Sequence, residues 1–309
     1  MRRNCSVGGQ AVIEGVMMRG SKGIATAVRK TDGEIIVNKE EFIPYSKRNS
    51  FFKIPIIRGF VSLLESLIIG IKTLNYSASF FQEDAEESKF DRWFENKFKD
   101  KGEKILISIT LIISLFISIL LFVALPNVFA NLFKKAAVEN TIILNIIEGI
   151  IRVSIFLVYI FFIGKMEDIN RVFQYHGAEH KTIFCYENEE ELIPENAKNY
   201  SRFHPRCGTN FLFLVMIVSI LVFSLTGWNS LLERILYRII LLPLVSGITY
   251  ELIKWLGKSN SSISKIIASP GLALQKLTTR EPNLSQLEVA IKALKAAEGI
   301  EYEENINEV

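Results

Sequence analysis

The chain has 309 residues, 49% of them hydrophobic and 22% charged, which excludes a disordered or collagen-like protein. Its 36 Lys and Arg nearly balance its 33 Asp and Glu, so we expect no nucleic-acid partner. The mean hydropathy of +0.26 is high for a water-soluble protein and comes from a few long apolar blocks. The three cysteines, Cys5, Cys185 and Cys207, are widely spaced and suggest no disulfide framework.

Residues 1–50 predict a small cytoplasmic region that contains β structure. We interpret GGQAVIEGVMMRG as a Gly-rich loop, whose glycine spacing matches no P-loop or dinucleotide fingerprint. The alternating segments ATAVRK and EIIVNK flank an Asp-Gly turn and predict a β-hairpin. Residues 51–104 then predict two helices at the membrane surface: an amphipathic helix over Ile54–Leu74 and a charged helix over 82–104.

Four apolar blocks predict membrane-spanning helices, over Ile105–Leu125, Thr141–Gly164, Cys207–Leu232 and Leu231–Leu256. The first block has 21 uncharged residues. At about 1.5 Å per residue its helix would be about 31 Å long, close to the thickness of a bilayer's hydrocarbon core. We therefore expect a mainly α, polytopic membrane protein with about four spans plus the amphipathic helix, surrounded by the lipid bilayer.

The Lys and Arg residues near the span ends predict the orientation. They place both termini and residues 165–206 in the cytoplasm. The predicted order after residue 104 is spans in 105–164, a cytoplasmic segment over 165–208, spans in 209–256, and a C-terminal helix with an acidic tail over 257–309.

Two further features concern these helices. Glu148 and Arg152 are four residues apart in an apolar block, so they share a helix face and should point into the bundle rather than at lipid.

In the C-terminal segment, Asn283 or Ser285 is a candidate N-cap for an amphipathic helix.

All three histidines of the chain, His176, His180 and His204, lie within 29 residues of the cytoplasmic segment. On a helix, residues four apart lie about 40° round from each other, so both imidazoles of His176 and His180 can reach one ion. The string His-Gly-Ala-Glu-His has the H-x-x-E-H order of the inverted zincins, in which the histidines bind zinc and the glutamate, here Glu179, is the general base. Cys207, before the third span, is a further candidate ligand because a helix start favours the thiolate.

Three interpretations stay open for this cluster. In a catalytic site, His176 and His180 hold Zn²⁺ or another divalent ion, and His204, Cys207 or a carboxylate completes a three-ligand set that leaves one position for water. In a structural site, all four residues bind and close the coordination shell. Without a metal, the histidines only make hydrogen bonds. A variant of the catalytic interpretation makes Cys207 a nucleophile with His204 or His176 as its base.

Two carboxylates elsewhere are weaker candidates for the same site. Glu251 lies near the cytoplasmic end of the fourth predicted span, at the depth expected of the histidines, and is a candidate distal ligand or hydrogen-bond partner of a ligand. Glu14 in the Gly-rich segment is a candidate of the same kind. Cys185 is nine residues beyond His176, on the opposite side of a continuous helix, so we assign it to packing.

Several long motifs occur together in this chain: GGQAVIEGVMMRG, YHGAEHKTIF, RFHPRCGTNF, LLPLVSGITYELIKW and PGLALQKLTTREP. With IPIIRGFVSLLESLIIGIKTLNYSA, they resemble the YqhQ-like family of bacterial membrane proteins over about residues 6–297. That family is a domain of unknown function that carries the label of a predicted metal-dependent enzyme. The resemblance implies an integral bacterial membrane protein with a metal site, and it names no substrate.

The sequence thus predicts a metal-dependent hydrolase that uses metal-activated water at the cytoplasmic membrane face, on a membrane-associated peptide or lipid-linked compound. The alternative is a non-enzymatic scaffold or assembly factor with a structural zinc site, which four protein ligands would favour over three. A transporter would be favoured by inverted repeats, and the sequence has no visible repeat.

Overall fold

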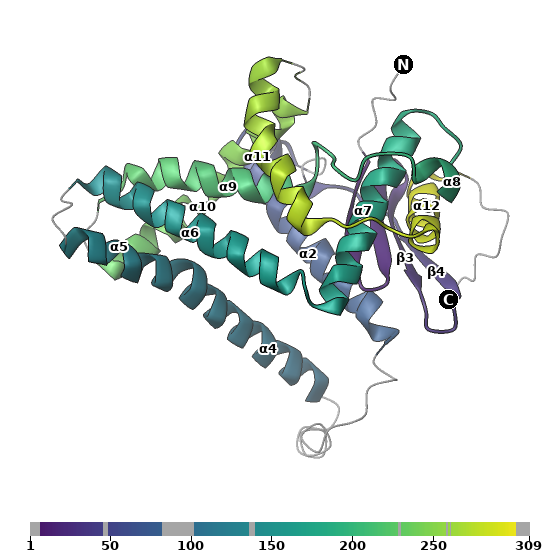
Figure 1. Cartoon of the computed structure of the whole chain (residues 1–309), viewed down its shortest axis with the longest axis horizontal. Helices are drawn as coiled ribbons and strands as arrows, with labels where there is room; N and C mark the ends of the chain where they lie inside the picture. The colour runs from purple at the N-terminus through teal and green to yellow at the C-terminus, as the bar shows by residue number, and fades with distance from the viewer. Residues whose placement is uncertain are drawn as a thin grey trace. The chain divides into compact units, whose positions relative to one another are not determined.

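The fold is known from a computed structural model (Figure 1). It describes residues 7–45, 49–81, 102–135, 140–227, 230–257, 259 and 261–300. The chain divides into two compact units. The sheet unit comprises Met1–Phe80, Ile160–Val218 and Leu241–Val309, and the bundle unit comprises Phe81–Tyr159 and Ser219–Ile240.

Four antiparallel strands in sequential order form the sheet: β1 (Gly8–Val12), β2 (Gly15–Gly20), β3 (Gly23–Arg29) and β4 (Ile35–Glu40). The predicted hairpin is confirmed as β3 and β4, paired from Ile24 with Glu40 to Arg29 with Ile35. The prediction of a Gly-rich loop before it is wrong. That segment forms β1 and β2, joined by a tight turn in which Glu14 has a φ of 48°.

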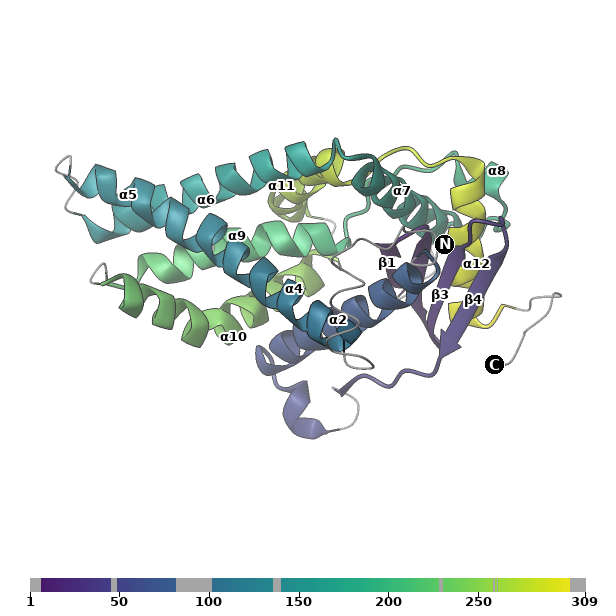
Figure 2. The same cartoon turned by 90° about the horizontal axis from the view of Figure 1, so that it is seen from below.

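Two helices from distant parts of the sequence cover one face of the sheet, α7 (Glu167–Glu187) and α12 (Leu284–Glu298), and Figure 2 shows both beside the strands. Met18, Ala25 and Ala27 on the strands are completely buried against these helices. The predicted cap of α12 is confirmed at Asn283, which forms a capping box with Gln286.

The other face of the sheet carries α2 (Ile57–Ser79), the predicted amphipathic helix. Ser77 of α2 accepts a hydrogen bond from the backbone N–H of Ile13 in the β1–β2 turn. The helix begins after Ile56, whose φ of 71° is incompatible with a helical turn. Of the charged helix predicted over 82–104, residues 82–101 lie outside the described residues.

The apolar helices are α4 (Gly102–Ile119), α5 (Leu125–Lys135), α6 (Thr141–Ile163), α9 (Gly208–Ser224) and α10 (Leu231–Leu256). Three described helices are long and apolar enough to cross a membrane: Ser108–Lys134, Thr141–Ile163 and Leu232–Leu256. These confirm a polytopic helical membrane protein with a small β region. The third predicted block is shorter as a helix, because α9 has 17 residues and is about 26 Å long.

A π-helical segment, Leu120–Ala124, joins α4 to α5 inside the first span, which Figure 1 draws as one continuous rod. Its cause lies in the sequence. Pro126 has no N–H to donate to the carbonyl of Phe122 four residues earlier. The Arg152 guanidinium on α6 supplies the missing donor, with Nε 2.9 Å from the Phe122 oxygen.

The remaining elements of the sheet unit are short or peripheral to the sheet. They are the 3₁₀ turn Ser50–Lys53, the single-turn helix α8 (Pro194–Ala197) and α11 (Ser262–Thr278). The extended segment 279–283 connects α11 to α12 and passes along α7. This passage matters for the site, because it brings backbone carbonyls against the histidine helix.

Candidate metal centre

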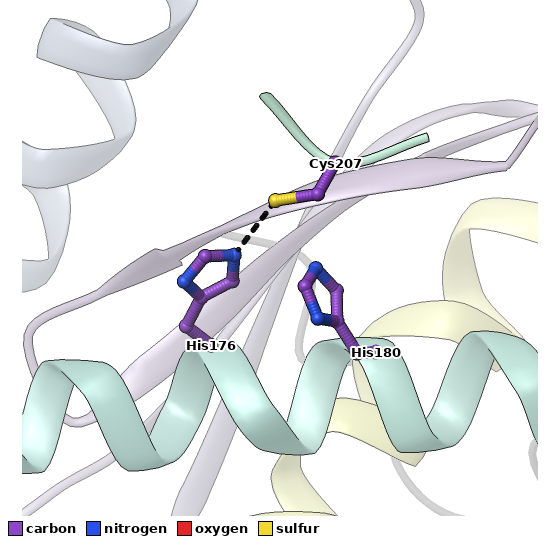
Figure 3. Close-up of side chains that lie close together, drawn as sticks. All are labelled: His176, His180 and Cys207. Carbon is purple, nitrogen blue, oxygen red and sulfur yellow. Dashed lines mark hydrogen bonds between the residues drawn. The ribbon is translucent and has the colours of Figure 1, made fainter. Parts of the chain in front are cut away.

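His176 and His180 project from one face of α7 toward Cys207, which precedes α9 (Figure 3). One ligand atom from each of the three residues lies within 4.8 Å of the other two. The Nε2 atom of His176 is 3.1 Å from the Cys207 sulfur. The helical spacing therefore does bring two imidazoles to one point, and the tertiary structure adds a thiol.

Backbone carbonyls fix the orientation of both imidazoles. His176 Nδ1 is 2.9 Å from the Thr278 carbonyl oxygen, and His180 Nδ1 contacts the Arg202 carbonyl oxygen. Because a carbonyl only accepts, each Nδ1 must donate, and Nε2 then carries the lone pair. Metal-binding histidines are held in this way, with the distal ring nitrogen donating to a carbonyl or carboxylate.

The Nε2 atom of His180 is buried and makes no regular hydrogen bond among the described residues, although the Cys207 side chain lies close enough to interact with the ring. Burial lowers the pKa of His180, which favours the neutral imidazole that a metal ion requires. A buried acceptor without a donor is costly, and a metal ion would satisfy it.

The third donor, Cys207, receives support from the start of α9. The backbone N–H of Thr209 donates to its sulfur at 3.4 Å, and the Thr209 hydroxyl is 3.2 Å from the same atom. These contacts hold the sulfur in place in front of the first turn of α9. Cys207 is 9% exposed, so the sulfur is largely shielded from bulk water.

Gly177 explains how the backbone approaches the histidines so closely. A Cβ atom at this position would lie 2.1 Å from the Arg280 carbonyl oxygen. The N–H of Arg280 donates to the Phe173 carbonyl of α7 at 2.8 Å. Only glycine at position 177 lets the segment 279–283 lie against α7. The close approach of this segment to α7 also places the Thr278 carbonyl beside His176.

His204, the fourth predicted ligand, lies near the other three but outside their group. Its ring centroid is 5.6 Å from that of His180. Its Nδ1 accepts from the Arg206 N–H at 3.3 Å, and its Nε2 is 3.8 Å from a carboxylate oxygen of Glu187. Gln275 holds the His204 backbone through two hydrogen bonds of 2.7 Å. The structure thus gives three converging ligands and a histidine beside them.

Glu179, the predicted general base, is 5% exposed and points toward β1. The N–H of Gly9 donates to its carboxylate, and a Cβ atom on Gly9 would lie 3.1 Å from the Glu179 carboxyl carbon. Burial raises the pKa of Glu179, while the nearby His176 and His204 act in the opposite direction.

The two weaker candidates are engaged elsewhere. Glu14 pairs with Arg171, and its second partner is the Tyr175 hydroxyl at 3.3 Å. Glu251 pairs with Arg58 of α2 through both carboxylate oxygens. Neither carboxylate belongs to the group formed by the two histidines and Cys207.

A pocket of about 870 Å³ adjoins the site within the sheet unit. Its walls come from β1, β2, α2 and the last turn of α10. Gly9, which donates to Glu179, and Arg206, which precedes Cys207, both line it. Arg19 and Lys254 add two cations, and Glu65 adds one carboxylate.

Sequence reasoning missed the pocket and the carbonyls that orient the histidines. Thr278 and Arg202 act through backbone oxygens, so their residue types carry no signal of the role. Gly9 and Gly177 are visible as glycines, but the contacts that require them depend on segments far apart in the sequence.

The sequence matches the family described as a protein of unknown function, DUF1385, over residues 54–299. The chain belongs to this family. It is 37% identical over 287 residues to the uncharacterized protein YqhQ of Bacillus subtilis strain 168, covering 93% of this chain and 90% of that protein. The resemblance to a YqhQ-like family is therefore confirmed. No solved structure matches the chain.

Proposed function

We propose that this member of the DUF1385 family is a metal-dependent membrane hydrolase. The observation that supports it is the convergence of one ring nitrogen each from His176 and His180 with the Cys207 sulfur within 4.8 Å, while both Nδ1 atoms contact backbone carbonyls. Imidazole nitrogen and cysteine sulfur are both ordinary ligands of zinc in proteins, so Zn²⁺ is the first candidate among divalent ions.

The number of ligands favours catalysis over a structural site. Three protein ligands leave one position of a tetrahedral shell open, whereas a structural zinc site has four. When bound there, a divalent ion would supply a nucleophile at neutral pH by lowering the pKa of a water molecule. The chain's own part is to hold the ligands in one tautomer and to keep the thiol shielded.

Glu179 is the residue we assign as the general base. It precedes His180 in sequence, lies within electrostatic range of His176, and is oriented by the Gly9 N–H. Its carboxylate would accept a proton during attack and return it to the leaving group. Burial shields it from competing water, and the adjoining pocket offers room for a substrate.

The substrate class follows from the surroundings. The apolar helices suggest a bilayer, so the substrate is membrane-associated, a peptide or a lipid-linked compound. Arg19 and Lys254 outnumber Glu65 in the pocket, while Arg206 is paired with Glu187, and this excess of positive charge favours a substrate with an anionic group. We place the site at the cytoplasmic face of the bacterial cytoplasmic membrane, with both termini cytoplasmic. Reporter fusions at each terminus would test that orientation.

Metal analysis of the purified full-length protein tests the centre itself. We expect about one equivalent of zinc or a similar ion in the wild type. His176→Ala should abolish metal binding, because His176 belongs to the ligand group. His204→Ala should retain the metal, because His204 does not belong to that group. Full metal content in His176→Ala would contradict the site.

A second experiment separates catalysis from metal binding. Glu179→Gln should retain the metal and lose hydrolysis of lipid-linked and peptide substrates in a screen. A variant that loses the metal instead would make Glu179 a ligand or a structural residue.

The alternative function is a scaffold or assembly factor with a structural zinc site. Its support is the depth of the ligands, since His180 is 1% exposed, and the nearness of His204 as a fourth ligand. X-ray absorption of the zinc-loaded protein would distinguish the two. One sulfur and three nitrogen ligands, with loss of one nitrogen in His204→Ala, would favour the scaffold.

A further inference from the structure

A second polar cluster lies in the bundle unit, among helices whose outer faces are apolar. We call it the arginine cluster. Its members come from α5, α6 and α10 and are Asn127, Glu148, Arg152, Arg234 and Arg238. Glu148 and Arg234 are 1% and 5% exposed, so the centre of the cluster is inaccessible to solvent. Ionised groups at such positions are costly and usually functional.

The charges of the cluster do not balance. Three arginines surround one glutamate, which leaves a net charge of +2 (3 − 1). Glu148 is the only buried carboxylate in the described part of the bundle unit, and Glu233 on α10 is exposed. Uncompensated positive charges are unfavourable in a medium of low dielectric constant, so we expect an anion to bind near them.

The hydrogen bonds show the same excess on the donor side. Arg152 and Arg238 both donate to one oxygen of Glu148. Arg234 donates to the side-chain oxygen of Asn127 at 3.0 Å, and the same oxygen accepts from Asn131 at 3.0 Å. The Nη1 atom of Arg238 and the Nδ2 atom of Asn127 are buried and have no hydrogen-bond partner among the described residues. The Oε2 atom of Glu148 is likewise without a hydrogen bond there, although the Arg234 guanidinium lies 3.8 Å from it. Two buried donors thus lack acceptors in a cluster that has one carboxylate for three guanidinium groups.

The arginine–glutamate pair in the sheet unit provides a contrast within the same chain. Arg58 binds Glu251 through two hydrogen bonds, one cation to one anion. Neither residue has a buried side-chain atom without a partner. One arginine is enough to neutralise one buried glutamate. The two additional arginines around Glu148 therefore require another explanation.

We propose that the arginine cluster binds a phosphoryl group, either that of an anionic membrane lipid or free phosphate. A phosphoryl group carries the missing negative charge and several acceptor oxygens, and the guanidinium fork matches its geometry. Arg152 and Arg238 retain 15% and 13% exposure of their side chains, so the group can reach them from the surface of the bundle unit.

The depth of the cluster agrees with a lipid headgroup. Glu148 and Arg238 are each seven residues from the first residue of their helix, Thr141 in α6 and Leu231 in α10. Seven residues correspond to about 10 Å of helix, a distance that long arginine side chains and a headgroup phosphate can bridge. With the predicted orientation, these helix ends face away from the cytoplasm.

Native mass spectrometry of the full-length protein, released from nanodiscs, tests the proposal. The probes are phosphatidylglycerol against zwitterionic phosphatidylcholine, and inorganic phosphate added to phosphatidylcholine nanodiscs. We expect retention of phosphatidylglycerol, or stabilisation by inorganic phosphate; the first result identifies a lipid as the source and the second a free anion. Arg238→Gln should weaken the affinity for the retained ligand by about tenfold or more, as expected for the loss of a charge-assisted hydrogen bond.

Two further variants keep the test decisive. Arg58→Gln removes an arginine from the balanced pair and should leave ligand binding unchanged. Arg238→Lys keeps the charge, so it should fold even if Arg238→Gln does not, and it should still weaken binding because lysine lacks the planar fork. Equal retention of both lipids together with no effect of phosphate would overturn the proposal. So would an equal loss of ligand in Arg58→Gln and Arg238→Gln.

Discussion

The sheet unit and the bundle unit differ in what they bury. In the sheet unit, apolar side chains such as Val12, Met18 and Leu287 are completely buried. In the bundle unit, Leu115 and Phe116 are 62% and 66% exposed. The groups buried there include Asn127, Glu148 and Arg234, all polar or charged. The bundle unit therefore exposes large apolar side chains of the kind that the sheet unit buries in its core.

The difference follows from the surroundings of each unit. Water favours burial of apolar surface, whereas lipid tails are as apolar as leucine and provide no such driving force. Helices in lipid must instead place their few charges inside. Buried polar groups therefore indicate candidate functional sites in both units. His180 in the sheet unit, and Asn127 and Arg238 of the arginine cluster in the bundle unit, retain buried side-chain atoms without hydrogen-bond partners among the described residues.

The largest effect is expected from the central charge of the bundle unit. Glu148→Gln leaves one buried and two half-buried arginines without their carboxylate, so the free energy of unfolding should fall by about 3–5 kcal/mol. Unfolding in detergent micelles, followed by circular dichroism, measures it. Glu233→Gln, on exposed surface of the same unit, is the matched control and should change little. Similar values for both variants would mean that Glu148 does not balance the arginines.

A pair of leucine truncations compares the two units directly. Leu287→Ala removes a fully buried side chain between α12 and the sheet and should cost about 2–5 kcal/mol. Leu115→Ala removes a side chain that is 62% exposed, and it should cost less than about 1 kcal/mol. The same unfolding measurement applies to both. A large cost at Leu115 would indicate that this face packs against protein rather than lipid.

Thiol chemistry distinguishes packing from function inside the sheet unit. Cys185 is completely buried, and burial raises the pKa of its thiol to about 11. Because the thiolate is the reactive form, alkylation of Cys185 should be very slow at pH 8 and should rise about tenfold per pH unit up to its pKa. Peptide mapping after iodoacetamide treatment measures the rate at each cysteine. Cys207 should be protected by zinc and released by a chelator, and rapid labelling of Cys185 at pH 8 would contradict its role in packing.

The smallest effect concerns the cap that positions α12 on the sheet. Asn283→Ala removes the side chain that accepts from the Gln286 N–H, so it should destabilise the sheet unit by about 1 kcal/mol. Asn283→Asp keeps an acceptor and should retain most of the stability. Thermal unfolding of the two variants measures the difference, and an Asp variant as unstable as the Ala variant would exclude capping as the cause.

Local patterns predicted most elements, and long-range contacts account for what they missed. The Asp-Gly turn predicted β3 and β4, and Asn283 predicted the start of α12, because both signals act over a few residues. The Gly-rich segment carries no comparable local signal, because the turn between β1 and β2 depends on the positive φ of Glu14 and on the pairing of Gly9 with Met18.

The candidate site divides in the same way. The four-residue spacing of His176 and His180 predicted that both imidazoles share a face, and helix geometry makes that certain once α7 forms. The separation of His204 from the group depends on Gln275 and Glu187, which lie 71 and 17 residues away in the sequence. No local pattern encodes such contacts.

The sequence by itself determined a membrane protein with a small β region and a histidine helix, because hydropathy, turn chemistry and helical spacing are properties of neighbouring residues. Only the tertiary structure decided which groups meet. It placed Cys207 rather than His204 beside the two imidazoles, and it gathered three arginines around Glu148. These encounters depend on how distant helices pack, since the reach of a side chain is a few ångströms while the chain positions involved are tens of residues apart.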